Sequence, residues 1–200
     1  HDNLKGDNVY SSKGAIHYIT ETEIEKAKPY LIKKINSQKV VSLILGGPNK
    51  YYSFDESQLI QIFNKIKSNF VSEGYKVIVI PSMRTPKASI ELAKKEMGSC
   101  GHVVNSVDKQ AYLSAYALAN YIVVTCDSTS MISEAATSGK PIFIAHMNAK
   151  RNNYRFKRFF DLFKKMGIAR DLGEKIETWS YNKHNEAERI ATLINNKIKN

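Results

Sequence analysis

The feature that most constrains the fold of this chain is the stretch from Tyr121 to Pro141, YIVVTCDSTSMISEAATSGKP. Its first residues, 121–125, predict a buried strand, because continuous apolar and β-branched residues are typical of a strand covered on both faces. A polar turn over 126–129 and a helix over 130–137 follow, and a glycine then ends the helix before a second strand. A strand that leads at once into a helix is half of a βαβ unit. The stretch therefore predicts an α/β fold.

The turn after this strand carries short polar side chains that suit a sugar or a phosphate. It lies at the carboxyl end of a strand, where free N–H groups and helix dipoles attract ligands in open α/β sheets. Glu134 lies about one turn into the helix and can accept hydrogen bonds from a ribose diol. The candidate contacts are Asp127, Ser128, Thr129, Ser130, Met131, Ser133 and Glu134. A plain helix cap by Ser128 or Thr129 explains these residue types equally well.

The rest of the chain continues the alternation of strands and helices. We expect strands over 39–45, 76–80, 102–104 and 141–146, and helices over 20–35, 53–71, 109–120 and 185–199. Start signals for helices are the capping boxes Thr20–Glu23 and Ser53–Glu56, Thr85 as N-cap before Pro86, and Asp108 as N-cap. This pattern predicts a doubly wound, Rossmann-like parallel sheet of five or six strands in the order 3-2-1-4-5. Its loops should converge on one edge.

Two other loops at this edge carry possible phosphate contacts. After the first strand, Gly46 and Gly47 allow a close approach of the backbone to a ligand, and Lys50 adds a cation. The loop matches neither a dinucleotide fingerprint nor a P-loop, so a simple tight turn is the alternative. After the second strand, Ser82 and Arg84 lie where a guanidinium can pair with phosphate or stack on a base. A solvated arginine is the alternative there. His146 ends the fifth strand and can face the same crevice, although a lone histidine is more often just hydrogen-bonded.

Length and composition indicate one ordinary domain. The 200 residues are 42% apolar, which is enough for a core of their own. The chain opens at His1 without the features of a signal peptide, so we expect a part of a longer protein. No apolar run approaches the ~20 residues that span a bilayer. Cys100 and Cys126 lack the spacing of a disulfide framework or a zinc site. A cytoplasmic protein, at most peripheral to a membrane, is the simplest interpretation.

The net charge of +11 is most concentrated in the segment KRNNYRFKR at 150–158. Such a segment can attract nucleic acid, an anionic lipid surface or a phosphorylated ligand, and a solvated helix face is the alternative. No signature of a nucleic-acid-binding module is present, so we expect no specific nucleic-acid partner. The phenylalanines that follow fall on one side of a helix and are expected to pack on the sheet: Phe156, Phe159, Phe160 and Phe163.

Four motifs occur in order over nearly the whole chain: HDNLKGDNV…GAIH, GGPNKYYSFDE, PSMRTP and VVTCDSTSMISEAATSGKP. Together they resemble the ELM-type mitochondrial fission family and its bacterial relatives, which are catalogued as nucleoside-diphosphate-sugar epimerases or glycosyltransferases. The resemblance implies a two-domain glycosyltransferase-B-like protein. Residues 1–36 would be a connector and leading helix from a missing amino-terminal domain, 37–180 the nucleotide-binding domain, and 181–200 a carboxyl-terminal helix.

The resemblance also implies a site for a nucleotide-diphosphate sugar as donor. The implied contacts are Gly46, Gly47 and Asn49 at the diphosphate, Ser82 and Arg84 near the nucleotide, and Asp127, Ser128, Ser130 and Glu134 at the sugar or ribose. Lys50, Thr85 and Met131 are further candidates for contacts with the ligand. No cofactor is expected, because no DxD motif or His/carboxylate cluster indicates a metal, and cations with helix dipoles can neutralise the leaving diphosphate. The general base is expected from the missing domain, with His17 and the pair His1 and Asp2 as weaker candidates.

Three classes of function remain open. The first is a metal-independent glycosyltransferase, or an epimerase on the same fold, whose fragment should bind a nucleotide weakly and turn nothing over. The second is a non-catalytic interaction protein of the fission type, and the third a nucleic-acid binder driven by charge. Besides the nucleotide sugar, the expected partners are the missing domain and an anionic membrane surface or lipid-linked acceptor.

Overall fold

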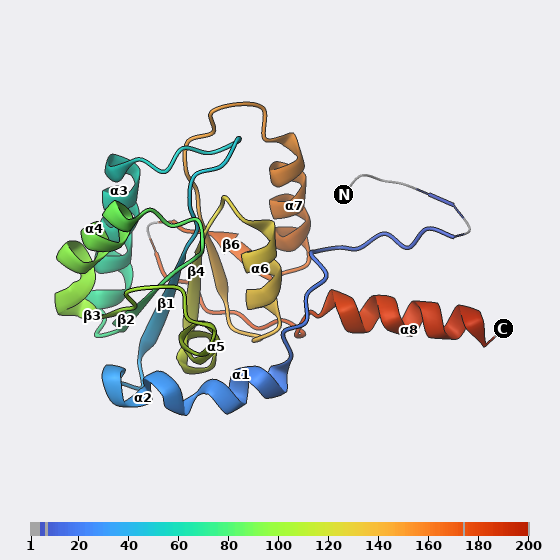
Figure 1. Cartoon of the computed structure of the whole chain (residues 1–200), viewed down its shortest axis with the longest axis horizontal. Coiled ribbons are helices and arrows are strands. Elements are labelled where there is room, and N and C mark those ends of the chain that lie inside the picture. Colours follow the sequence, from blue (N-terminus) through green and yellow to red (C-terminus); the bar gives the residue numbers. More distant parts are fainter. Residues whose placement is uncertain (1–4, 7, 174, 200) are drawn as a thin grey trace.

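A computed structural model describes residues 5–6, 8–173 and 175–199, so the candidates His1 and Asp2 lie outside the described residues. The protein is organised around a six-stranded sheet in the order β3-β2-β1-β4-β5-β6 (Figure 1). Every neighbouring pair of strands is parallel. The strands are β1 (Val40–Leu45), β2 (Lys76–Pro81), β3 (Gly101–Val103), β4 (Tyr121–Thr125), β5 (Ile142–Ala145) and β6 (Ala169–Asp171). The predicted strand order is confirmed, with the sixth strand next to the fifth.

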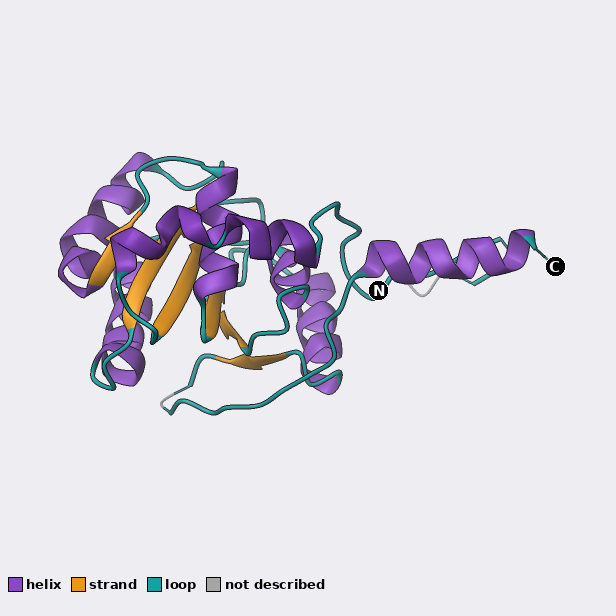
Figure 2. Ribbon diagram, turned by 90° about the horizontal axis from the view of Figure 1, so that it is seen from below, coloured by secondary structure: helices purple, strands orange, loops and turns teal. Residues whose placement is uncertain are grey.

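Helices connect the strands and cover both faces of the sheet (Figure 2). They are α1 (Glu21–Ala27), α2 (Pro29–Ile35), α3 (Glu56–Ile66), α4 (Lys87–Met97), α5 (Lys109–Leu118), α6 (Thr129–Ala136), α7 (Tyr154–Lys165) and α8 (Glu186–Ile198). A π-helical turn, η1 (Lys67–Val71), extends α3, and a 3₁₀ turn, η2 (Gly98–Cys100), follows α4. The chain leaves β1 and β4 toward opposite edges of the sheet. Their carboxyl ends therefore border the crevice where ligands bind in open α/β folds.

The sheet shares one hydrophobic core with α1 and α2, the helices that precede β1 in the chain. Strands β1 and β4 are buried along their whole length, as expected for apolar strands covered on both faces. On α1 and α2, the buried residues Ile24, Ala27, Leu31 and Ile35 belong to the same core. The leading helices α1 and α2 thus pack against α5 and share one core with the sheet.

Three predicted helix starts or spans differ from the structure. Pro29 divides the helix expected over 20–35 into α1 and α2, because proline lacks the N–H that would continue the hydrogen-bonding pattern. Ser53 forms no capping box with Glu56, since its hydroxyl accepts from the Gln58 side chain and Asp55 is the N-cap of α3. Thr85 is not an N-cap either, because α4 starts after Pro86 and the Thr85 hydroxyl contacts β1 instead. The predicted caps at Thr20 and Asp108 are confirmed.

The lead-in segment and helix α8 lie on the same side of the fold, away from the sheet (Figure 1). Helix α8 extends outward, and both views place the lead-in segment beside it (Figures 1 and 2). Glu186 at the start of α8 is buried and accepts a hydrogen bond of 2.7 Å from the Lys13 backbone N–H. The lead-in then reaches α6, where the Ala15 N–H donates to the Ser133 hydroxyl. Among the described residues, no helix is both long and apolar enough to cross a bilayer.

Candidate functional site

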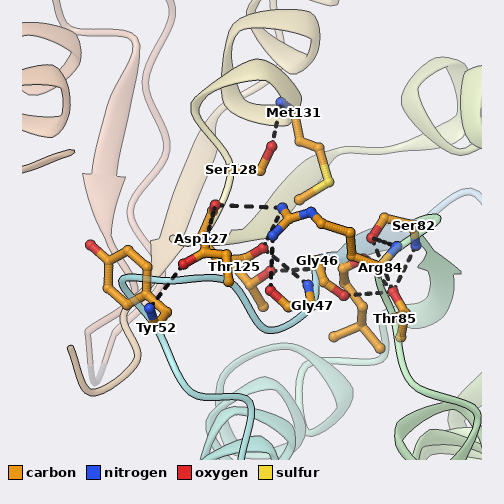
Figure 3. Close-up of polar contacts among 12 residues, drawn as sticks. Gly46, Gly47, Tyr52, Ser82, Arg84, Thr85, Thr125, Asp127, Ser128 and Met131 are labelled. Carbon is orange, nitrogen blue, oxygen red and sulfur yellow. Dashed lines mark hydrogen bonds and ion pairs between the residues drawn. The ribbon is translucent and has the colours of Figure 1, made fainter. Parts of the chain in front are cut away.

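Three loops that are distant in the sequence meet at the carboxyl edge of the sheet, and Arg84 joins them (Figure 3). Its Nη1 donates to the Gly47 carbonyl oxygen at 3.0 Å, and its Nη2 lies 2.8 Å from Asp127 Oδ2. The loops after β1, β2 and β4 are thereby held together, as their shared position at the ends of parallel strands predicted. The convergence of the three loops is confirmed.

The two glycines after β1 are required by the protein's own atoms. A Cβ at Gly46 would lie 2.0 Å from Asp127 Oδ2, and a Cβ at Gly47 would lie 2.0 Å from the Arg84 carbonyl oxygen. The Gly46 N–H donates to Thr125 Oγ1 at 2.8 Å, which ties the loop to β4. The predicted reason for these glycines was a close approach of the backbone to a ligand. The structure gives a different reason, because Asp127 and the Arg84 loop occupy that space.

Asp127 forms the centre of this arrangement. Its side chain is fully buried, and Oδ2 accepts from the Gly47 N–H at 3.0 Å in addition to Arg84. Its Oδ1 is buried without a hydrogen-bond partner among the described residues. Asn49 supports the loop from the other side, since its Nδ2 donates to the Asp127 carbonyl and its Oδ1 accepts from the Tyr51 and Tyr52 N–H groups. Asp127 therefore positions Arg84 and the glycine loop from beneath the surface.

A cavity of about 340 Å³ opens beside Arg84. Five of the predicted site residues line it: Ser82, Arg84, Ser128, Met131 and Glu134. The remaining wall is made of Tyr18, Ile19, Pro81, Met83, Val107, Asp108, Lys109 and Tyr112. The other residues predicted as ligand contacts are not part of this wall: Gly46, Gly47, Asn49, Lys50, Thr85, Asp127, Thr129, Ser130 and Ser133. The cavity thus combines one guanidinium, several hydroxyls and carboxylates, and an apolar rim.

The start of α6 forms one side of the cavity. Ser128 is the N-cap and accepts from the Met131 N–H at 3.4 Å, so the capping interpretation of this serine is confirmed. Ser130 is exposed in the first turn of α6. The Thr85 hydroxyl lies 2.9 Å from the Leu45 carbonyl oxygen and 2.6 Å from that of Gly46, which fixes the second loop to β1. Both Ser128 and Thr85 therefore shape the backbone around the cavity.

Glu134 places a carboxylate on the cavity wall. The Tyr112 hydroxyl donates to Glu134 Oε2, and the Tyr116 hydroxyl donates in turn to that of Tyr112 at 2.6 Å. Burial raises the pKa of Glu134, although the Tyr112 hydrogen bond and the nearby His17 oppose the rise. Burial also raises the pKa of Tyr112 well above its ordinary value, so the phenol stays a donor. A carboxylate held in this way can accept further hydrogen bonds from a diol in the cavity.

Several residues of the cavity wall were not predicted as site residues, among them Tyr18, Lys109 and Tyr112. Tyr112 on α5 is half-buried, packs against the core and also lines the cavity. Tyr18 and Lys109 come from different segments, and Lys109 Nζ lies 4.8 Å from the Tyr18 ring centroid. The lead-in segment gave no signal that Tyr18 would reach the sheet edge. Only the adjacent His17 was considered, and its Nε2 lies 3.2 Å from the Ser133 carbonyl oxygen.

His146 and Lys50 also lie near this edge of the sheet but outside the cavity wall. His146 does not line the cavity, and its Nε2 lies 2.6 Å from Asp171 Oδ1, so the interpretation of a hydrogen-bonded histidine is confirmed. Lys50 is exposed and places its Nζ over the Tyr51 ring, at 5.0 Å from the centroid. Within the described ranges, no three His, Cys, Asp or Glu side chains gather as a metal site would require.

Comparisons with known proteins agree with this architecture. The family model described as Mitochondrial fission ELM1 matches residues 1–198. The chain is 31% identical over 210 residues to Uncharacterized protein RP120 of Rickettsia prowazekii, covering 97% of this chain and 56% of that protein. It is 25% identical over 199 residues to Mitochondrial fission protein ELM1 of Arabidopsis thaliana, covering 96% of this chain and 46% of that protein. The chain therefore spans about half the length of these curated relatives.

A solved structure shares the fold. The S. aureus MnaA–UDP co-structure superposes with a TM-score of 0.51 at 15% sequence identity, covering 82% of this chain and 39% of that chain. At this identity the likeness concerns the fold alone. The predicted fold class, a doubly wound parallel α/β sheet, is confirmed.

Proposed function

The chain belongs to the mitochondrial fission ELM1 family, and we propose that it is the nucleotide-sugar-binding half of a glycosyltransferase-B-like protein. The observation that carries the proposal is the cavity at the carboxyl edge of the sheet, which is lined by both Arg84 and Glu134. A diphosphate requires a cation, and a ribose or sugar diol requires an acceptor. Both requirements are met within one cavity.

In the proposed complex, Arg84 contacts the diphosphate. Its side chain is 40% exposed even while Asp127 and Gly47 hold it, so the outer N–H groups of the guanidinium can reach a ligand. The N-terminus of α6 lies beside it, where Ser128 and Ser130 and the positive end of the helix dipole favour an anion. Glu134 accepts from the ribose or sugar hydroxyls. The apolar side chains of Met83 and Val107 flank the base.

The chemistry requires neutralisation of the negative charge that develops on the leaving diphosphate. Arg84 and the α6 dipole supply this without a resident cofactor. Asp127 acts as the positioning residue for Arg84, and Lys50 stays outside the cavity wall. The acceptor and its general base come from the missing amino-terminal half. His17 is the candidate base among the described residues, because it lies against α6 near Glu134.

The proposal includes the organisation of the whole protein. Residues 1–36 lead in from the missing amino-terminal domain, 37–180 bind the nucleotide, and the helix within 181–200 returns toward that domain. Exposed apolar residues on α8, Leu193, Ile194 and Ile198, fit such a return. We further propose a cytoplasmic location and a lipid-linked acceptor.

Calorimetry of the 200-residue chain with UDP, GDP, ADP and CMP tests the proposal. We expect one preferred diphosphate. Substitution Glu134→Gln should weaken its binding about tenfold, since hydrogen bonds to a charged acceptor contribute about 1.5–3 kcal/mol. The matched control Glu25→Gln changes an exposed carboxylate on α1 and should leave binding unchanged.

Two outcomes would contradict this account. Equal binding by wild type and Glu134→Gln would place the nucleotide elsewhere. Absence of binding by all four nucleotides would favour a non-catalytic interaction protein, in line with the fission function in the name of the Arabidopsis relative. The chain alone should transfer no sugar, because half of the proposed active site is missing. Measured turnover by the isolated chain would refute that point.

A further inference from the structure

A second surface at the same edge of the sheet is not used by the proposed donor site. It is formed by the loop after β1 and the loop after β5, which meet at the top of Figure 1 beside the start of α7. We call it the basic loop surface and define it by Lys50, Tyr51, Lys150, Arg151, Tyr154, Arg155 and Lys157. All of these residues except the half-buried Tyr51 are exposed. None of them lines the cavity beside Arg84.

The two loops are held in a fixed arrangement. Tyr52 and Ala149 form an antiparallel bridge, and the Lys150 N–H donates to the Tyr51 carbonyl oxygen at 2.7 Å. The Asn153 Nδ2 donates to the Tyr52 hydroxyl at 2.9 Å. Phe156 of α7 packs edge-on against the rings of Tyr51 and Tyr52, each at 5.2 Å between centroids. The cations are therefore presented on ordered backbone, so little backbone entropy is lost when they bind a partner.

The charge on this surface has one sign. Residues 147–160 contain five cations, Lys150, Arg151, Arg155, Lys157 and Arg158, and no Asp or Glu. The loop 46–54 adds Lys50 and also lacks an acid. The first acid of α7, Asp161, lies 3.5 Å from Lys164 and is thus paired within its own helix. A partner that complements this surface must be densely anionic.

The aromatic side chains favour a lipid headgroup layer over nucleic acid. Lys50 Nζ and Arg151 Cζ both lie over the Tyr51 ring, at 5.0 and 5.6 Å from its centroid. Arg158 Cζ lies 4.9 Å from the centroid of the Tyr154 ring. Because the protein's own cations occupy these ring faces, the rings are poor platforms for stacked bases, on which single-stranded nucleic acid depends. Tyr154 is 61% exposed, and a tyrosine with an apolar body and a polar tip suits a membrane interface.

We propose that the basic loop surface docks on an anionic lipid bilayer. The phosphates of the headgroups would neutralise Lys50, Lys150, Arg151 and the cations of the first turn of α7. Since the surface lies at the carboxyl edge of the sheet, docking would bring that edge toward the bilayer. Docking on a bilayer does not depend on nucleotide binding, so an experiment can refute either proposal and leave the other standing.

Cosedimentation with lipid vesicles tests the inference. The vesicles are phosphatidylcholine alone, or phosphatidylcholine with phosphatidylglycerol as roughly a third of the lipid. We expect the full chain to bind only the anionic vesicles, with binding that weakens as salt is added. Each Lys or Arg near an anionic surface contributes about a factor of five, so the double substitution Lys150→Gln and Arg151→Gln should weaken binding about 30-fold.

The matched control is the double substitution Lys33→Gln and Lys34→Gln in the last turn of α2. Both lysines are exposed, and α2 lies at the opposite end of the sheet (Figure 1). The control removes the same net charge and should weaken binding less than about threefold. Circular dichroism checks that both variants keep the fold.

Three results would overturn the inference. Equal losses in the two double variants would show that net charge, and not this surface, drives binding. Equal binding to neutral and anionic vesicles would exclude an electrostatic contact. Tighter binding to a short single-stranded DNA than to the anionic vesicles, lost with Lys150→Gln and Arg151→Gln, would assign the surface to nucleic acid.

Discussion

The ion pair between Arg84 and Asp127 is predicted to stabilise the loops that surround the cavity. The test is a double-mutant cycle of Asp127→Asn, Arg84→Met and the combined variant. Asparagine keeps the shape of the side chain beside Gly46, and its oxygen can still accept from the Gly47 N–H. Methionine keeps the length of the arginine stem without its charge. The cycle therefore isolates the charge interaction.

The magnitudes follow from the burial of the two partners. The Asp127 side chain is fully buried, whereas that of Arg84 is 40% exposed, so solvent weakens their attraction. Asp127→Asn loses one charge-assisted hydrogen bond and should cost about 2 kcal/mol. Arg84→Met leaves a buried carboxylate with only the Gly47 N–H and should cost about 3–4 kcal/mol. The combined variant should cost no more than Arg84→Met alone, which gives a coupling of about 2 kcal/mol.

Urea unfolding of the four proteins at neutral pH measures the coupling. The Lys67–Glu96 pair is a suitable comparison, because its N–O distance of 2.9 Å is similar and both of its side chains are partly exposed. Its coupling, from Lys67→Met and Glu96→Gln, should stay below about 1 kcal/mol. Additive effects at Arg84 and Asp127, with a coupling under about 0.5 kcal/mol, would refute the view that Asp127 holds Arg84 in place.

Two further predictions concern the free energy of unfolding. Gly46→Ala should cost more than about 3 kcal/mol, because the new Cβ would lie 2.0 Å from Asp127 Oδ2. Gly74→Ala should cost about 1 kcal/mol, because Gly74 has open space around it and a φ of +83°. Similar costs of the two substitutions in urea unfolding would contradict this reasoning. Burial raises the pKa of Glu186, but hydrogen bonds from Arg189 and the Lys13 N–H outweigh burial and lower it overall. The stabilisation is therefore present above the ordinary value of 4.5 and is lost as the pH falls through the lowered pKa. Glu186→Gln should cost about 2 kcal/mol at neutral pH and progressively less in acid, and a difference independent of pH would contradict the reasoning.

The architecture could be predicted from the sequence because each element carries a local signal. The apolar, β-branched runs at 39–45, 76–80 and 121–125 predicted buried strands, and their alternation with helices predicted the strand order of a doubly wound sheet. The helix start at Asp108 was predictable from its N-cap, and the structure shows its carboxylate accepting from two N–H groups. The division of the first helix into α1 and α2 was not predicted, although a proline such as Pro29 lacks the N–H that continues a helix.

The site was only partly predictable, since contacts across the sheet edge depend on tertiary structure. The sequence indicated that the loops near 47, 84 and 127 would meet. It could not show that the Asp127 carboxylate would occupy the space at Gly46, because that depends on the separation of β1 and β4. Tyr112 has core-like spacing, yet one helix face can serve both the core and a cavity. Tyr18 lies in an irregular segment without any periodic signal.

The most direct test of the central claim is an amide ¹H–¹⁵N NMR titration of the 200-residue chain with UDP. The account predicts that the signals of Ser82, Arg84, Ser128, Met131 and Glu134 shift together with one dissociation constant, while those of Lys150 and Arg151 stay in place. Shifts confined to the loop around Lys150, or spread evenly over the chain, would contradict a nucleotide site beside Arg84.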